Sequence, residues 1–249
     1  MPSKLPIFAT RILTLLILCI SLSNCTNNSS QYRYSIEDAR MHMKQNNWDS
    51  ARIYAVHVLA ESQEKRDISL AHAIISMARE NLETDHEERL AKKEDAFSKL
   101  RRVHDLQEGI SWYYASTTTP YTNTASIHLY LGERGDDYWI RFRIQHRGSK
   151  PLDLLGCTIQ CKDRDYTFAP ESEIIHGKEE GAYWEYFDQK YNETTHAIIS
   201  DIIAADQAQL ILIGSGGNAE RRISKDEIQA MRDILQAYEV SQLDETQIE

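Results

Sequence analysis

The spacing of apolar residues changes at Glu108–Gly109 of this 249-residue chain, and this change limits the folds that the chain can adopt. Before it, as in residues 51–59, apolar side chains recur every three or four positions, which is the period of an α-helix. After it, as in residues 140–144, apolar and polar side chains alternate, which is the period of a half-buried β-strand. Helices followed by strands predict an α+β fold. We therefore expect an N-terminal helical hairpin region followed by an antiparallel sheet with helices packed on one face.

The helical region is expected to span residues 35–107. Ser35 stands before a helical pattern that begins with acidic residues, which is typical of an N-cap. Asn46–Asn47 ends this helix, and a second helix begins near Asp49. Two helices joined by a tight turn form an antiparallel hairpin.

The hairpin resembles one tetratricopeptide repeat. In that family a small residue of the first helix packs against a small residue twelve positions later, and Ala39 and Ala51 have this spacing. Trp48 fills the aromatic position before the second small residue, and Val58 fills a later position, whereas His42 stands where an aromatic residue is expected. The alternative is an ordinary helical hairpin with alanines in its core.

A third helix is predicted from an N-cap at Asp67, because a single hairpin needs a neighbour to cover its apolar face. Residues 79–102 are heavily charged, and an apolar stripe that includes Phe97 continues to Leu106. This pattern predicts a solvent-exposed helix that joins the two halves of the chain.

The second half, residues 108–241, is expected to form the α+β domain, followed by a disordered tail at 242–249. Short loops between its strands favour an antiparallel meander. Two helices are expected among the strands, one over 196–205 and one after Ser224, where Ser224 and Glu227 have the spacing of a capping box. The strands are expected at 110–114, 127–131, 139–144, 155–161, 166–168, 183–187 and 209–213.

This half is similar to an uncharacterised C-terminal domain found in bacterial lipoproteins. The residues that carry the similarity are an aromatic first strand, Tyr130-Leu131-Gly132 at a strand end, Trp184-Glu185 in a later strand, and a final capped helix. The family implies no activity, so the similarity identifies no catalytic residues.

The N-terminus carries a short apolar run that follows Lys4 and Arg11 and ends in Leu22-Ser23-Asn24-Cys25. A basic segment followed by a short apolar segment is the pattern of a secretory signal. Its ending resembles the lipobox of bacterial lipoproteins, although that family prefers Gly, Ala or Ser where this chain has Asn24. The alternative is an ordinary secretory signal with a chance cysteine.

The lipobox resemblance implies a signal peptide at residues 1–24 and a lipid on Cys25. The polar residues 25–34 would then be a tether, and the contact with the membrane would be made by the lipid on Cys25. The implied location is the bacterial cell envelope, facing the periplasm.

The acidic composition argues against nucleic-acid binding. The net charge is −10, and removal of the two basic residues of the signal leaves 26 basic and 38 acidic residues, a net charge of −12. Nucleic-acid binding depends on neutralising phosphates with Lys and Arg. Cys157 and Cys161 fall four residues apart in one predicted strand, about 13 Å from each other, so we favour two small buried side chains over a disulfide.

Motifs for metals, cofactors and catalysis are missing from the sequence. His86-Glu87-Glu88 has no second histidine at metal-binding spacing, and no Cys-x-x-Cys pair occurs, so no metal and no cofactor are expected. Gly214–Gly217 lacks the lysine of a nucleotide-binding loop and reads as a turn. Glycoside hydrolysis requires a pair of carboxylates. Four neighbouring acidic residues could form one, but acidic residues are abundant in this chain, so we favour no catalytic role for them; they are Glu179, Glu180, Glu185 and Asp188.

Alternation in the central strands predicts a candidate binding surface of Tyr130, Trp139, Arg141 and Arg143 on one side of the sheet. Aromatic and arginine side chains are typical anchors of protein interfaces. The alternative is that a helix covers this side and the arginine stems lie beneath it. We expect a non-enzymatic module that binds an envelope protein partner. The alternatives are binding of a glycan or small ligand and, less favoured, a hydrolase.

Overall fold

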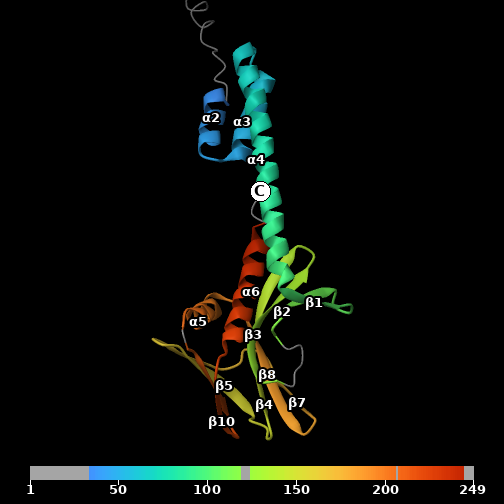
Figure 1. Ribbon diagram of the computed structural model, residues 1–249, viewed down its shortest axis with the longest axis vertical. Coiled ribbons are helices and arrows are strands. Elements are labelled where there is room, and N and C mark those ends of the chain that lie inside the picture. The colour runs from blue at the N-terminus through green and yellow to red at the C-terminus, as the bar shows by residue number, and fades with distance from the viewer. Residues whose placement is uncertain (1–33, 119–123, 206, 244–249) are drawn as a thin grey trace, which may run out of the picture. The chain divides into compact units, whose positions relative to one another are not determined.

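The computed structural model describes residues 34–118, 124–205 and 207–243 (Figure 1). Over these residues the chain forms five helices and ten strands in two antiparallel sheets, which confirms the α+β class. The expected signal peptide, Cys25 and nearly all of the tether and tail lie outside the described residues. The chain divides into two compact units, residues 1–86 and 87–249, and each is described by itself.

The first unit contains helices α2 (Ile36–Lys44) and α3 (Trp48–Glu61) and the first part of α4 (Lys65–Ser98). Ser35 caps α2 as expected, because its hydroxyl accepts a hydrogen bond from the Asp38 N–H at 3.1 Å. The Asp38 carboxylate accepts in return from the Ser35 N–H at 3.3 Å. Membership of the tetratricopeptide family stays a prediction. The core of this unit consists of Ile36, Ala39, Ala51, Ala55, Val58, Ala71 and Ile74.

The expected helix at residues 100–106 is wrong, because α4 ends at Ser98 and strand β1 (Leu100–Asp105) follows. Apolar residues three apart imitated a helical stripe, but they are not buried: Val103 is 46% exposed and Leu106 is 87% exposed. Strand β1 is held instead by its backbone pairing with β2 (Ile110–Ala115).

The second unit contains two sheets where one was expected (Figure 1). The chain leaves the first sheet after β4, and β5 pairs with β9 through a register shift between Leu154 and Gly156. The six-stranded sheet has the order β1, β2, β3 (Ser126–Arg134), β4 (Asp137–Gly148), β8 (Ala182–Lys190), β7 (Ile175–Glu179). The four-stranded sheet has the order β10 (Gly217–Arg222), β9 (Gln209–Gly214), β5 (Leu154–Gln160), β6 (Asp165–Phe168).

Helices α5 (Glu193–Ala204) and α6 (Lys225–Gln242) complete this unit. The predicted capping box of α6 is confirmed, and its Glu227 carboxylate also accepts from the Ile127 N–H at 3.0 Å. That bond ties the start of α6 to β3. Helix α6 contacts β2, β3 and β4 on the side where Leu129, Phe142 and Ile144 are fully buried. The opposite side of the six-stranded sheet is therefore not part of this core.

No helix in the described part of the chain is both long enough and apolar enough to cross a membrane.

Candidate binding face

One side of the six-stranded sheet carries a continuous group of aromatic and charged side chains. Its members are set by strand register, because residues directly opposite each other in an antiparallel pair point to the same side. The described helices of this unit pack into the core on the other side. We call this surface the aromatic face, and it consists of Trp112, Tyr114, His128, Tyr130, Trp139, Arg141, Arg143, Trp184, Tyr186, Asp188 and Lys190.

The four residues predicted from sequence lie together on this face. Tyr130 is opposite Arg141, and Trp139 and Arg143 stand two residues to either side of Arg141 on β4. Tyr130 is 5% exposed, whereas the other three are half-buried. Since α6 packs against the opposite side, the alternative of a helix lying over these residues finds no support among the described helices.

Aromatic side chains of three neighbouring strands contact one another at the centre of the face. The Tyr130 ring stacks on Tyr114, with centroids 5.3 Å apart, and lies 5.2 Å from Trp112. Trp112 in turn meets Trp139 edge-on at 5.7 Å. Such pairs stabilise by about 0.5–1.5 kcal/mol beyond the area that they bury. The rings therefore form a rigid surface with little side-chain entropy left to lose on binding.

Arg143 is fixed beside these rings by a carboxylate and two tyrosines. Its guanidinium forms two 2.8 Å hydrogen bonds with Asp188, and it lies 4.0 Å above the Tyr186 ring and 5.2 Å from that of Tyr130. Burial opposes the charged form, but the hydrogen bonds to Asp188 and the charges around it outweigh burial and raise the pKa of Arg143. Arg143 therefore stays charged, and the Asp188 carboxylate balances its charge.

Two tryptophan rings pack closely against glycines of the neighbouring strands. A Cβ atom added to Gly132 would come within 2.4 Å of the Trp139 ring, and one added to Gly177 would come within 2.3 Å of the Trp184 ring. The absence of a side chain at these glycines is what lets each indole rest on the backbone. Both tryptophans remain half-exposed, so each presents ring surface to a ligand.

Arg141 and Lys190 are directly opposite each other on β4 and β8. Across the described residues, neither side chain has an ion pair or a hydrogen bond. Arg141 is half-buried and Lys190 is exposed. Like charges directly opposite each other in a sheet are destabilising. Among the described residues, no carboxylate offsets the repulsion between these two cations.

His128 lies at the inner end of the face and is 5% exposed. Burial lowers its pKa to about 4, and the nearby Arg143 charge acts in the same direction. Its Nδ1 atom lies 3.2 Å from the Ser126 hydroxyl. The imidazole is therefore neutral at pH 7, and it packs among the other side chains of the aromatic face.

Two of the acidic residues considered for hydrolysis, Glu185 and Asp188, point to opposite sides of β8 and do not form a catalytic pair with each other. Glu185 is 3% exposed, and its carboxylate accepts hydrogen bonds from the backbone N–H groups of Leu152, Asp153 and Leu154 at 2.6, 3.0 and 2.8 Å. Asp188 points to the opposite side of β8 and is bonded to Arg143. Both carboxylates therefore have structural partners on different sides of the sheet.

Gly214–Gly217 forms the turn between β9 and β10, as the sequence predicted. The Ser215 N–H donates to the carbonyl of Asp153 and the Gly216 N–H to the carbonyl of Leu152, each at 3.0 Å. These amide groups are already used, so they cannot cradle a phosphate.

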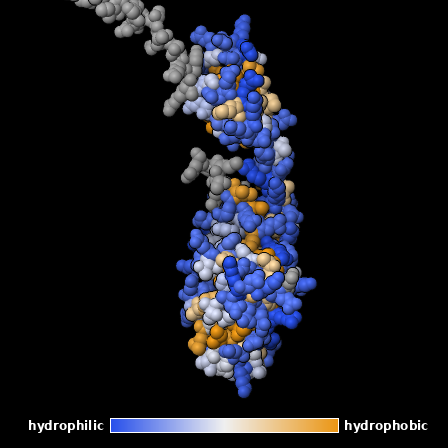
Figure 2. Space-filling model, turned by 90° about the vertical axis from the view of Figure 1, so that its left-hand side faces the viewer, coloured by the Kyte–Doolittle hydropathy of each residue, from blue (hydrophilic) through white to orange (hydrophobic). Residues whose placement is uncertain are grey.

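A cavity of about 560 Å³ lies beside this turn, within the second unit. Hydrophobic surface is visible on this unit in Figure 2. Glu185 is among the residues that line the cavity, and both oxygens of this carboxylate accept hydrogen bonds from backbone amides. The other lining residues of the cavity include Pro151, Leu155, Ile174, His176, Tyr183 and Trp184.

The two cysteines of β5 and its end are free thiols. Cys157 is fully buried, and burial raises the pKa of its thiol to about 12, while Cys161 is half-buried. This agrees with the expectation of small buried side chains for Cys157. Throughout residues 34–118, 124–205 and 207–243, no group of three His, Cys, Asp or Glu side chains has the arrangement of a metal site.

Comparisons with models of protein families, with curated proteins and with solved structures found no match to this chain.

Proposed function

We propose that this protein is a lipid-anchored module of the bacterial cell envelope that binds a protein partner on the aromatic face. The observation that carries the proposal is a sheet surface with half-exposed Trp, Tyr and Arg side chains that the described helices leave open. Trp, Tyr and Arg dominate the energetically important residues of protein interfaces. The lipobox-like N-terminus supports the location, because a lipid on Cys25 would hold the module at a membrane.

The geometry of the face suits a partner that is bound without rearrangement. Tyr130 is held by Tyr114 and Trp112, and Arg143 is held by Asp188, so these groups are ordered before a partner arrives. A pre-ordered interface avoids about 0.5–1.5 kcal/mol of ordering cost for each side chain that is already fixed.

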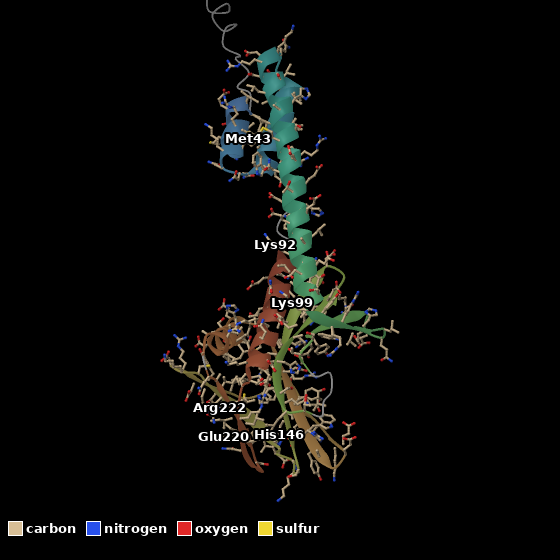
Figure 3. The ribbon with its side chains drawn as sticks, in the orientation of Figure 1. Met43, Lys92, Lys99, His146, Glu220 and Arg222 are labelled. Atoms are coloured by element: carbon tan, nitrogen blue, oxygen red, sulfur yellow. The ribbon has the colours of Figure 1, made fainter. Side chains whose placement is uncertain are left out.

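Crosslinking in cells tests this function directly. A photoreactive amino acid is placed at Tyr186, on the face, and in a matched protein at Arg222, on β10 of the other sheet (Figure 3). We expect one envelope protein to be captured from Tyr186 and not from Arg222. Equal capture at both positions would show that the partner does not bind specifically at the aromatic face. Capture of no protein from Tyr186 would contradict the proposed function.

Binding of a glycan is the second candidate, and the two half-exposed tryptophans favour it. Trp139 lies two residues from Arg141 on β4, and Trp184 is opposite Arg147, and arginine side chains can donate hydrogen bonds to sugar hydroxyls. Sedimentation of the full-length protein with purified cell-wall glycan separates the candidates. Sedimentation that Trp139→Ala abolishes, with the circular dichroism spectrum unchanged, would favour the glycan.

The lipid anchor has its own test. Cys25→Ala is expected to abolish labelling by palmitate and to release the protein from membranes. Continued labelling of the variant would contradict the lipobox assignment, whatever the face binds.

A further inference from the structure

We infer that Arg141 and Lys190 form a carboxylate-binding site, which takes an acidic side chain of the protein partner. This inference rests on the proposed function of the aromatic face and names the chemistry of what binds there. It is carried by the position of two cations beside Trp139 to which the described residues supply no ion-pair partner.

Strand pairing places the two cations directly opposite each other, and the carboxylate nearest to them on these strands, Asp188, lies two residues from Lys190. Arg141 and Lys190 are cross-strand neighbours, so their Cβ atoms are about 4.5–5.5 Å apart. One step along the same two strands, Arg143 is opposite Asp188 and the pair is complete. The sheet thus has a carboxylate opposite one arginine and a lysine opposite the next. A ligand carboxylate between Arg141 and Lys190 would complete the second position in the same way.

These two cations lie on a protein whose net charge is negative. The chain has 38 acidic and 28 basic residues, and its net charge is −10. On this part of the face the nearest carboxylate on the paired strands, Asp188, already forms two hydrogen bonds with Arg143. Arg141 and Lys190 therefore give a locally positive site on an acidic protein. Complementary charge across an interface selects partners and speeds association.

The neighbouring rings define what should flank the partner's acidic residue. Trp139 precedes Arg141 by two residues on β4, so it lies about 7 Å along the strand on the same side. Trp112 supports it edge-on from β2. An extended segment with its carboxylate at Arg141 and Lys190 would place a side chain two residues away over Trp139. The site therefore fits an acidic segment that also carries aromatic or apolar residues.

The three tryptophans of the face provide a readout, because the fourth tryptophan of the chain, Trp48, lies in the helical unit. The full-length protein in detergent is labelled with 5-fluorotryptophan, and each fluorine resonance is assigned by a Trp→Phe variant. The probe is a random copolymer of glutamate and tyrosine, and the control polymer is a copolymer of lysine and tyrosine. We expect only the glutamate copolymer to shift the Trp139 resonance, with Trp48 unmoved and with weaker binding at higher salt.

Substitution of the cations separates this site from general charge attraction. The double variant Arg141→Gln/Lys190→Gln is expected to weaken copolymer binding at least tenfold. Arg222→Gln, which removes an exposed arginine of the other sheet, is expected to leave it unchanged (Figure 3). Equal binding by the double variant would overturn the inference, as would equal weakening in Arg222→Gln.

The remaining outcomes distinguish this inference from the proposed function. If crosslinking from Tyr186 captures a protein but the glutamate copolymer leaves Trp139 unmoved, the function stands and the carboxylate site is wrong. If phosphatidylglycerol vesicles or inorganic phosphate shift Trp139 and the copolymer does not, the site binds phosphate and the inference is overturned. A shift produced by the copolymer and lost in the double variant supports it.

Discussion

Arg143 on β4 and Asp188 on β8 form a two-point ion pair across the sheet, with Nε–Oδ1 and Nη2–Oδ2 distances of 2.8 Å. The two side chains are 17% and 22% exposed, so the pair is largely removed from water. A planar guanidinium bound at two points is fixed in direction as well as in position. This pair therefore orders the centre of the aromatic face as well as contributing to the sheet.

Loss of the carboxylate should destabilise the second unit. Asp188→Asn leaves the Arg143 charge without its partner, and we expect the free energy of unfolding to fall by about 2–3 kcal/mol, somewhat less than for a fully buried pair. Urea unfolding followed by tryptophan fluorescence measures this, because three of the four tryptophans lie in the sheet.

An exposed pair on α4 is the control for that measurement. Lys92 is labelled on α4 in Figure 3. Its Nζ atom lies 3.9 Å from Oε2 of Glu88, and the two side chains are 66% and 64% exposed. Lys92→Ala is expected to change the free energy of unfolding by no more than about 0.5 kcal/mol. If the free energy of unfolding falls by similar amounts in Asp188→Asn and Lys92→Ala, the Arg143–Asp188 pair stabilises the protein no more than an exposed ion pair does.

The buried imidazole predicts a loss of stability in mild acid. The pKa of His128 is about 4 in the fold, chiefly through burial, against an ordinary value of 6.5. Between these values the unfolded chain binds more protons than the folded chain, so stability falls as the pH decreases. The contribution is complete above pH 6.5 and is lost toward pH 4, to a total of about 3 kcal/mol.

Comparison of variants isolates this histidine. His128→Gln is expected to flatten the dependence of the urea midpoint on pH between about 6.5 and 5, before most carboxylates titrate. His104→Gln, at an exposed position of β1, should leave the dependence as it is. An unchanged slope in His128→Gln would mean that His128 is not the group responsible.

The strands that the hydrophobic pattern does not predict share one physical property. Strands β1, β7 and β10 are all at sheet edges. An edge strand is paired on one side only and is largely exposed, so its side chains need no alternating apolar pattern. Strand β10 reads Gly-Asn-Ala-Glu-Arg-Arg and contains no large apolar residue. Its pairing with β9 is a backbone property that the hydrophobic pattern does not report.

The part of the candidate site that lies on the β3–β4 hairpin was predictable from the sequence, and the part on β8 was not. Strands β3 and β4 are adjacent in the chain, so alternation alone places Tyr130 and Arg141 on one side. The other half of the face comes from β8, which pairs with β4 only after three intervening strands. Trp184 and Lys190 alternate correctly in the sequence, but their side of the sheet depends on that long-range register. For this reason the sequence alone could not predict that Arg141 and Lys190 are directly opposite each other.

The carboxylate of Glu185 should control the order of the loop before β5. It accepts three backbone hydrogen bonds from residues 152–154, so Glu185→Gln replaces a carboxylate, whose two oxygens both accept, with an amide that introduces an NH₂ donor in place of one of them. A buried donor left unsatisfied costs about 1–3 kcal/mol. We expect amide hydrogen exchange to rise at least tenfold in a peptide that covers residues 150–156, with exchange in α6 unchanged. Exchange that rises equally in both would indicate general destabilisation rather than a local role.

The contact between Gly132 and Trp139 can be tested by a double-mutant cycle. Gly132→Ala puts a methyl group within 2.4 Å of the Trp139 ring, so the indole must leave its place on the backbone. Overpacking of this kind costs about 1–3 kcal/mol. Trp139→Ala removes the ring, so adding Gly132→Ala to that variant should cost far less than adding it to the native chain. Urea unfolding of the four proteins gives the coupling energy, and additive costs would show that the ring does not rest on this glycine.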